Sequence, residues 1–425
     1  MTVPELWYRL GSVKEQGLLE RHKGRFHGLV IPAHILVWWR TWINEFLPKL
    51  GKPFIVDPMT YALALDPDLI SKETGMKKSW GKLIEYLGKN MSKAFSSGPL
   101  KPNALVDSKW KSTSLLDSIV RKSLELQTDL CRSRSPSQAS LDKYRRMLGE
   151  ETKGEIKPDV LVAPYFHFRD ENDPLYSVNV ASVQETVSLG GKFKVHAVVS
   201  TDMPFLRSAD WGRVVRDFKG VDGLILWISG FNERRSSVAD LTAVAMAVRE
   251  LSQRVETVHM LYGGYFSLSL AALGLSRLSH GICYGDSKSI DFKATGGGFA
   301  TRFYLEGLKM KTVVTNARAL FSERPIKPCR CPVCAELWRI SGMSGRGKPT
   351  LMQIEAYFGT IDDEHAGAHF MEIRHEESVN LRGQSASEIA SLLRQMEANA
   401  APIPVRDYDL ESDHLGRWAE TLEGC

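Results

Sequence analysis

Residues 194–264 contain three almost continuously apolar runs, KVHAVVS (194–200), VDGLILWI (221–228) and TVHMLYGG (257–264). Strands that are buried on both faces of a parallel sheet have this composition. The sequence between these runs is typical of helices, which we expect over 205–218 and 237–254. An alternation of buried strands with helices on this scale predicts an α/β fold.

Four more runs of the same kind extend the pattern in both directions. They are FHGLVIP (26–32), PFIVDP (53–58), DVLVAPYF (159–166) and GICYGD (281–286), and further helices are expected over 34–48 and 266–279. Seven strands spread over about 260 residues suit a (β/α)8 TIM-like barrel better than a short open sheet. A doubly wound sheet is the alternative, since hydrophobic periodicity does not show whether a sheet closes.

The composition is that of an ordinary globular protein. The chain has 425 residues, of which 43% are hydrophobic and 25% charged, and its net charge is +5. This length allows two or three domains, or one large barrel with additions, and the composition excludes a disordered or collagen-like chain. Apolar runs stay well short of the roughly 18 residues of a membrane span, and the N-terminus lacks the apolar core of a signal peptide. We therefore expect a cytoplasmic protein without membrane contact.

One segment interrupts the strand–helix pattern and carries the net positive charge of the chain. Residues 76–157 contain 17 Lys and Arg against 9 Asp and Glu, and they predict a basic helical insertion. Aromatic residues are interleaved with the basic ones, which favours contact with a polyphosphate backbone. The alternative is a solvated helical face whose aromatic residues belong to a core. The nucleic-acid contacts expected within the insertion are Arg132, Arg134, Arg145 and Arg146.

Three of the six cysteines are crowded into PCRCPVC, which contains Cys329, Cys331 and Cys334. Thiolates so close together can share one tetrahedral zinc, which then needs a fourth ligand. The candidates lie in a later predicted helix and are His365, His369 and His375. A zinc with four protein ligands has no open position and is structural. The alternatives are a redox pair or a chance cluster, and the sparse cysteines argue against a disulfide framework.

The cysteine motif and several shorter motifs resemble those of the tRNA-guanine transglycosylases. The cysteines and the later helix start EHAGAHF (364–370) are similar to that family's zinc subdomain, and NAR (316–318) precedes the cysteines as a similar triplet does there. GVDG (220–223), GICYGD (281–286) and KPFIVD (52–57) are similar to other family motifs. The resemblance covers residues 26–60 and 159–375.

The resemblance implies a reaction and assigns roles to three residues. It makes His365 the fourth zinc ligand, Asp286 the nucleophile and Asp57 the general acid/base of a base exchange. Such an enzyme forms a covalent aspartyl–sugar intermediate, which splits one difficult displacement into two. Considered without the resemblance, Asp57 is a turn residue before proline and Asp286 is a helix N-cap.

The chain departs from the family around the base pocket. PMTY (58–61) stands where the family has Ser-Gly-Gly, and VST (199–201) replaces a Gln-Gly turn. The family also has an acidic residue that binds the edge of guanine, and the region of Pro164 and Tyr165 lacks one. With the basic insertion, these departures make the chain similar to the DpdA-type DNA-guanine transglycosylases, which insert a 7-deazaguanine into DNA. The implied partners are DNA and free 7-cyano-7-deazaguanine, and an accessory duplex-opening ATPase is compatible with them. The alternatives are the same exchange on tRNA and a non-catalytic nucleic-acid-binding protein.

Turns after the predicted strands supply further candidates. A base pocket could be lined by the turns that follow two neighbouring strands, namely Ser229, Gly230 and Phe231 after one and Gly263 and Gly264 after the next. Arg302, behind three glycines at 296–298, could bind a phosphate. Other polar residues expected near this rim are His167, Asp170, Asp202 and Asp222.

The predicted organisation has five parts. Residues 1–75 start the barrel, 76–157 form the basic insertion, 158–320 complete the barrel, 321–396 form the zinc-binding subdomain and 397–425 form a C-terminal tail.

Overall fold

The computed structural model describes residues 4–65, 71–72, 75–96, 98–106, 114–129, 140, 143–144, 147–148, 157–282, 286–291, 300–323, 329–342, 349–400 and 413–425.

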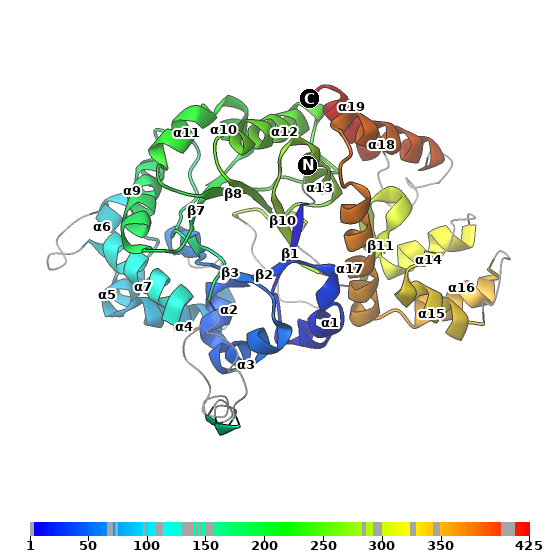
Figure 1. The fold of residues 1–425 in the computed structure, drawn as a ribbon, viewed down its shortest axis with the longest axis horizontal. Coiled ribbons are helices and arrows are strands. Elements are labelled where there is room, and N and C mark those ends of the chain that lie inside the picture. The colour runs from blue at the N-terminus through cyan, green and yellow to red at the C-terminus, as the bar shows by residue number, and fades with distance from the viewer. Residues whose placement is uncertain are drawn as a thin grey trace.

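Eight parallel strands form a nearly closed barrel with helices around it (Figure 1), which confirms the predicted (β/α)8 fold. The strands are β1 (Glu5–Arg9), β2 (Gly28–Pro32), β3 (Phe54–Asp57), β6 (Leu161–Val162), β7 (Val195–Thr201), β8 (Gly223–Ile228), β9 (Thr257–Leu261) and β10 (Arg277–His280). Their order is β3-β2-β1-β10-β9-β8-β7-β6, so the first strand pairs with the last, with Tyr8 opposite His280. The order ends at β3 and β6, and there the backbone N–H of Asp159 donates to the carbonyl oxygen of Phe54 at 2.8 Å.

Buried side chains complete the seam between β3 and β6. The amide of Gln127, from α7 (Leu115–Asp129), bonds both the N–H and the C=O of Val162 at 2.8 Å. The hydroxyl of Thr60 likewise accepts from the N–H of Tyr165 and donates to its C=O, both at 2.8 Å. These side chains satisfy backbone groups that would otherwise be buried without partners.

Two strands differ from the prediction. β1 was not predicted, because its five residues ELWYR begin and end with a charged residue and form no continuous apolar run. β10 is the short, polar segment RLSH, and the predicted strand GICYGD follows it in the chain instead of belonging to it. Both strands are recognisable from their pairing in the sheet, where β1 lies between β2 and β10, and β10 lies between β1 and β9.

The helices of the barrel lie at or near the expected positions, and two of the expected ranges are each divided into two helices. The range 34–48 contains α2 (Ala33–Trp38) and α3 (Arg40–Leu50), 205–218 contains α10 (Met203–Ser208) and α11 (Trp211–Asp217), and 237–254 contains α12 (Val238–Ser252). The range 266–279 is shorter, with α13 (Tyr265–Ser269) and one 3-10 turn before β10 begins, and α9 (Pro174–Leu189) joins β6 to β7. Side chains of Asp173, Asp210 and Ser237 cap α9, α11 and α12.

The described part of the basic insertion is mainly helical. It contains α4 (Lys78–Leu87), α5 (Lys89–Ser96), α6 (Pro102–Val106) and α7, next to a small hairpin of β4 (Ser71–Lys72) and β5 (Gly75–Met76). Trp80 is buried and stacks on His34 of α2 at 4.7 Å between ring centroids, so this aromatic residue belongs to the core. Arg132, Arg134, Arg145 and Arg146 lie outside the described residues.

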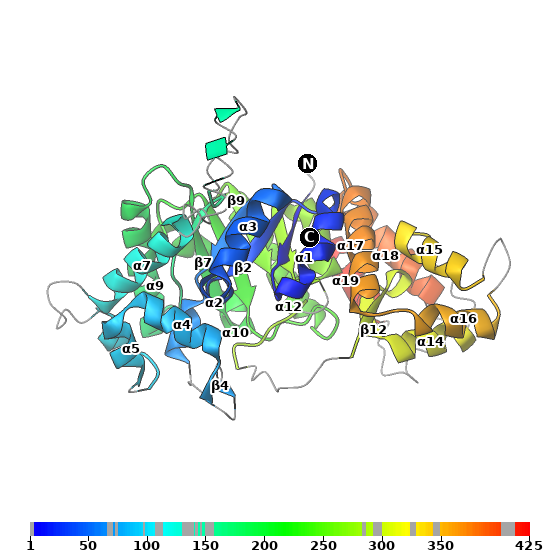
Figure 2. The same cartoon turned by 90° about the horizontal axis from the view of Figure 1, so that it is seen from below.

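The C-terminal part adds a hairpin and six helices on the side of the barrel opposite the insertion (Figures 1 and 2). The elements are β11 (Arg302–Leu305), β12 (Met310–Val313), α14 (Val314–Glu323), α15 (Pro332–Ile340), α16 (Leu351–Gly359), α17 (Asp363–Asn380), α18 (Ala386–Ala400) and α19 (His414–Glu423). α19 packs against α12, and Trp418 donates its indole N–H to the backbone of Glu233 at 2.8 Å. Across the described ranges, no helix has both the length and the hydropathy needed to cross a membrane.

We predict that Gln127→Leu lowers the free energy of unfolding by about 2–4 kcal/mol, because a buried backbone N–H and C=O of Val162 lose their partners together. The measurement is the midpoint of urea unfolding at an unchanged m-value. Gln184→Leu is the matched control, since its amide bonds two carbonyl groups near the surface at 3.2 and 3.4 Å. Equal stability of both variants would show that Gln127 does not hold the seam.

Candidate active site and metal centre

Asp57 is fixed at the C-terminal end of β3, the end at which catalytic residues of this fold gather. Its side chain is buried, and both carboxylate oxygens are occupied. Arg9 donates to Oδ2 at 2.7 Å, while the hydroxyl of Tyr165 at 2.9 Å and the N–H of Met59 at 3.0 Å donate to Oδ1. A proton transfer through Asp57 would therefore have to displace or use one of these partners.

Two residues beside Asp57 and Arg9 have left-handed backbone conformations. Met59 has a φ of 54° and Tyr262 a φ of 59°, which are unfavourable for residues other than glycine. Arg9 contacts both, with its guanidinium 3.2 Å from the sulfur of Met59 and 5.2 Å from the ring centroid of Tyr262. Strain of this kind clusters at functional sites, where the surrounding structure enforces it.

Lys288 lies in an aromatic box at the same end of the barrel. Its Nζ is 5.1–5.3 Å from the ring centroids of Tyr61, Trp227 and Tyr262, and it bonds the hydroxyls of Tyr61 at 2.5 Å and Tyr262 at 3.4 Å. Burial, together with the charge of Arg9, lowers the pKa of Lys288 to about 7. The amine therefore changes charge near neutral pH, unlike an ordinary surface lysine.

Asp286 lies in the segment after β10, on the side of the barrel that faces the C-terminal helices. Its side chain is 38% exposed and pairs with Lys311 of β12 at 3.2 Å. Burial acts to raise the pKa of Asp286, but the charges of Lys311, His280 and Arg374 outweigh it and hold this pKa below the usual range. Asp286 is thus an ionised carboxylate with access to solvent, as a nucleophile must be.

The predicted base-binding residues of the β8 turn hold the segment that carries Asp286 and Lys288. The N–H of Gly230 donates to the carbonyl oxygen of Lys288 at 3.0 Å, and the hydroxyl of Ser229 accepts from the N–H of Ile290 at 2.9 Å. Phe231 is buried. These polar groups are already used within the protein, so the turn positions the segment that contains Lys288 and Ile290.

The second predicted turn is held by a residue that the sequence did not single out. Glu233 is buried and accepts from the N–H of Gly264 at 2.7 Å and from those of Phe266 and Ser267 at 3.0 Å. A Cβ on Gly263 would lie 2.5 Å from Leu278 and Ser267, so close packing explains this glycine. The backbone N–H groups of Gly264, Phe266 and Ser267 are therefore already hydrogen-bonded to the carboxylate of Glu233.

The remaining rim candidates have local roles in the described structure. His167 bonds Ser200 at 3.2 Å and lies 3.3 Å from Asp202. Asp170 caps the N–H of Asn172, while Asp222 accepts from the N–H of Val195 at 2.8 Å. Arg302 begins β11 and is exposed, and the glycines at 296–298 lie outside the described residues.

A cavity of about 270 Å³ opens among the segments that follow β1, β2, β3 and β10. Its polar lining includes Arg9, Glu15, His34 and Lys288. Its apolar lining includes Leu10, Pro32, Ile35, Met59 and Ile282. Apolar walls with a few convergent polar groups are typical of small-ligand sites. Glu15 and Lys288 belong to no recognisable motif, and they come together only through the fold of the barrel.

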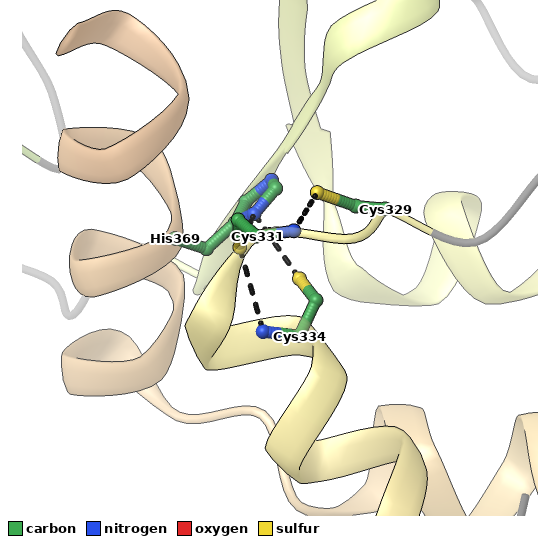
Figure 3. Close-up of side chains that lie close together, drawn as sticks. All are labelled: Cys329, Cys331, Cys334 and His369. Atoms are coloured by element: carbon green, nitrogen blue, oxygen red, sulfur yellow. Dashed lines mark hydrogen bonds between the residues drawn. The ribbon is translucent and has the colours of Figure 1, made fainter. Parts of the chain in front are cut away.

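Four residues converge in the C-terminal part (Figure 3). The ligand atoms of Cys329, Cys331, Cys334 and His369 all lie within 4.8 Å of one another. Nδ1 of His369 is 3.4 Å from the sulfur of Cys331 and 3.2 Å from that of Cys334. The three predicted cysteines are thus brought together and could bind a metal ion with this histidine.

His369, and not His365, completes this cluster, which corrects the ligand implied by the family resemblance. Both residues lie on α17, but His365 is in its first turn, is 41% exposed and bonds Asp362 at 2.7 Å. His369 is one turn further along and is buried. The motif indicated the correct helix, α17. The packing of α17 against β11 places His369, and not His365, beside the cysteines.

Surrounding groups orient the ligands. Nε2 of His369 bonds the carbonyl oxygen of Tyr304 at 2.8 Å, which leaves Nδ1 to face the sulfurs, and its ring stacks on Phe303 with centroids 4.3 Å apart. The hydroxyl of Tyr357 donates to the sulfur of Cys334 at 3.1 Å. Metal-binding histidines are usually held through their second nitrogen in this way.

The charge at the cluster also suits a cation. Burial alone would lower the pKa of His369, but the sulfurs of Cys329 and Cys331 raise it to about 10. A divalent ion bound among these groups would neutralise the thiolates and favour neutral imidazole as a ligand. The donor set and the geometry therefore fit a tetrahedral metal site with four protein ligands.

Comparisons with known proteins add little. Neither a protein-family model nor a curated protein matches the chain. Among solved structures, a psychrophilic glycoside hydrolase family 10 endo-β-1,4-xylanase aligns with a TM-score of 0.31 and 10% sequence identity, covering 65% of this chain and 86% of that chain. A similarity this low carries no argument about function.

We predict that His369→Ala abolishes stoichiometric metal binding, whereas His365→Ala retains one metal ion per chain. The reason is that only His369 lies with the cysteines, although both histidines belong to the same helix. Elemental analysis of the two purified variants measures this difference, and thermal unfolding tests the expected loss of stability in His369→Ala. Metal loss in His365→Ala alone would restore the ligand implied by the resemblance.

Proposed function

We propose that the protein is a transglycosylase that exchanges guanine in DNA for a 7-deazaguanine base, 7-cyano-7-deazaguanine. The observation that carries the proposal is a pair of carboxylates at the C-terminal end of a (β/α)8 barrel. Asp57 ends β3, and Asp286 lies in the segment after the last barrel strand, as in the motifs that resemble the tRNA-guanine transglycosylases. The Cys–Cys–Cys–His cluster supports the same family.

In the proposed mechanism, Asp286 is the nucleophile. Its ionised carboxylate attacks C1′ of the deoxyribose, the bond from C1′ to N9 of guanine breaks, and an aspartyl–sugar ester forms. The entering base then attacks C1′ through its own N9, and the ester bond breaks. Lys311 keeps Asp286 ionised before the attack and stabilises it again when it leaves.

Asp57 is the general acid/base in this proposal. The leaving guanine must gain a proton as the C1′–N9 bond breaks, and the entering base must lose its N9 proton. Asp57 would enter the cycle protonated, give this proton to the leaving guanine and take one back from the entering base. Arg9 and Tyr165 hold the carboxylate of Asp57 in one orientation. The hydroxyl of Tyr165, which donates to Asp57, is a route by which such a proton can reach it.

We infer that the metal is zinc and that its role is structural. Three thiolates and one imidazole are the donor set of structural zinc sites, and four protein ligands leave no position for a substrate or a reactive water. Zinc would hold α15, α17 and β11 together and take no part in the chemistry.

DNA is the proposed partner because of the excess positive charge in residues 76–157. A guanine inside a duplex must leave the base stack to reach a barrel mouth, which an accessory duplex-opening protein could assist. The same exchange on tRNA is the second candidate, because the resemblance to the family includes no residue that distinguishes deoxyribose from ribose. A non-catalytic nucleic-acid-binding protein is the third.

We predict that Asp286→Asn abolishes a covalent adduct with guanine-containing DNA, since an amide cannot form the sugar ester. Asp57→Asn should slow base exchange by roughly 10² to 10⁴, the scale of general acid–base assistance. Mass spectrometry of the trapped adduct identifies the modified peptide. Asp291→Asn is the matched control, as an exposed acid on the same segment. An adduct that persists in Asp286→Asn would refute the assignment, and an adduct with tRNA alone would favour the second candidate.

We also predict that replacing Arg132, Arg134, Arg145 and Arg146 by glutamine weakens DNA binding and flattens its dependence on salt. Each lost phosphate contact should reduce the slope of log K against log salt by about 0.9. Fluorescence anisotropy at several salt concentrations measures this slope. Arg216→Gln, on the exposed surface of α11, is the control and should leave the slope unchanged.

A further inference from the structure

We propose that the cavity lined by Glu15 and Lys288 is the site that binds the exchanged base. This inference rests on the proposed function for the identity of the base, and it deepens that function by naming the groups that read it. The ligand class is a planar purine-type base that carries a carbonyl group and, beside it, an N–H and an amino group on one edge. Guanine and 7-deazaguanines have this edge, and adenine does not.

The walls of the cavity suit a flat heterocycle. Leu10, Ile35, Met59 and Ile282 supply apolar surface, and the polar lining is restricted to a few groups. At about 270 Å³ the cavity is small for a drug-sized ligand and suits a single base. Apolar faces with polar groups at the edge are how enzymes bind bases that have left the stack.

Glu15 is the acceptor for the two donors of the base. Both hydrogen bonds that it makes within the described part of the chain go to Oε2, from the N–H of Gly11 at 2.9 Å and of Ser12 at 3.4 Å. These bonds fix the carboxylate in its loop and leave Oε1 for a ligand. Glu15 therefore supplies the acid that the family carries elsewhere and that is missing near Pro164 and Tyr165.

Lys288 and Arg9 are the donors for the carbonyl oxygen of the base. The amine of Lys288 is held by the phenol groups of Tyr61 and Tyr262, and Arg9 is anchored by Asp57. With its pKa lowered to about 7 by burial and by Arg9, Lys288 carries an N–H donor in either charge state. The cavity thus has an acceptor in Glu15 and donors in Lys288 and Arg9, complementary to the edge of guanine.

The position of the cavity fits the reaction. Lys288 is two residues from Asp286, so their Cα atoms are at most about 7 Å apart. A base bound by Lys288 would hold its glycosidic bond near the proposed nucleophile. The turns first predicted to bind the base have no such groups available, because Gly230 bonds Lys288 and Gly264 bonds Glu233.

The test is direct binding of free bases to the full-length protein by calorimetry, in the absence of nucleic acid. We expect guanine and 7-cyano-7-deazaguanine to bind and adenine not to bind. Glu15→Gln should weaken binding roughly 10-fold to 100-fold, the scale of a lost hydrogen bond to a charged group. It keeps an acceptor for Gly11 and Ser12, so the loop should stay folded. Lys288→Met should weaken binding about 10-fold, and Glu20→Gln, on α1 (Gln16–Arg21), should have no effect.

The outcomes separate this inference from the proposed function. Base binding that depends on Glu15 and Lys288, without a covalent adduct on DNA or tRNA, would support the site and refute the exchange reaction. An adduct on DNA, with base binding unchanged in both variants, would support the reaction and refute the site. Binding of adenine as tight as that of guanine, or no binding of either base, would also overturn the assignment of the cavity.

Discussion

The closure of the barrel at the seam between β3 and β6 is the constraint on which the rest of the structure depends. Seven neighbouring pairs of strands are joined by regular backbone hydrogen bonds. At this seam, side-chain hydrogen bonds of Gln127 and Thr60 take the place of such a backbone ladder. Gln127 belongs to a helix of the basic insertion, so the insertion is part of the barrel wall. Thr60 lies next to Met59 and brings Tyr165 within reach of Asp57. The same bonds that complete the fold therefore shape its mouth.

The other closing contact, between β1 and β10, explains how residues distant in the sequence form one site. β1 pairs with β10 on one side and with β2 on the other, and β2 in turn pairs with β3. Arg9, at the end of β1, therefore lies between the segment after β10, which contains Lys288, and the end of β3, which contains Asp57. Arg9 can then bind Asp57, and its charge adds to the effect of burial in lowering the pKa of Lys288. Two left-handed residues, Met59 and Tyr262, are tolerated at this point because the surrounding contacts hold them there.

The sequence was sufficient for the fold class and for the cysteine cluster, for different physical reasons. Strands buried on both faces are apolar throughout, so six of the barrel strands were visible as runs, and three closely spaced cysteines are rare enough to stand out. Strands as short and polar as RLSH have no such signal. His365 and His369 share one helix face, and only the packing of α17 distinguishes them. Glu15 and Lys288 have no motif, since the fold alone brings them to one cavity.

The cluster of Cys329, Cys331, Cys334 and His369 is connected to Asp286 by a short and continuous set of contacts. His369 bonds the backbone of Tyr304 in β11, and Tyr304 is paired in register with Lys311 of β12. Lys311 bonds Asp286, and the ring of Phe370, the neighbour of His369 in the chain, lies 3.7 Å from its amine. Lys311 lies at the end of this set of contacts, and its charge helps to lower the pKa of Asp286. The cysteine–histidine cluster and the barrel mouth therefore share the hairpin of β11 and β12, which contacts His369 through Tyr304 and Asp286 through Lys311.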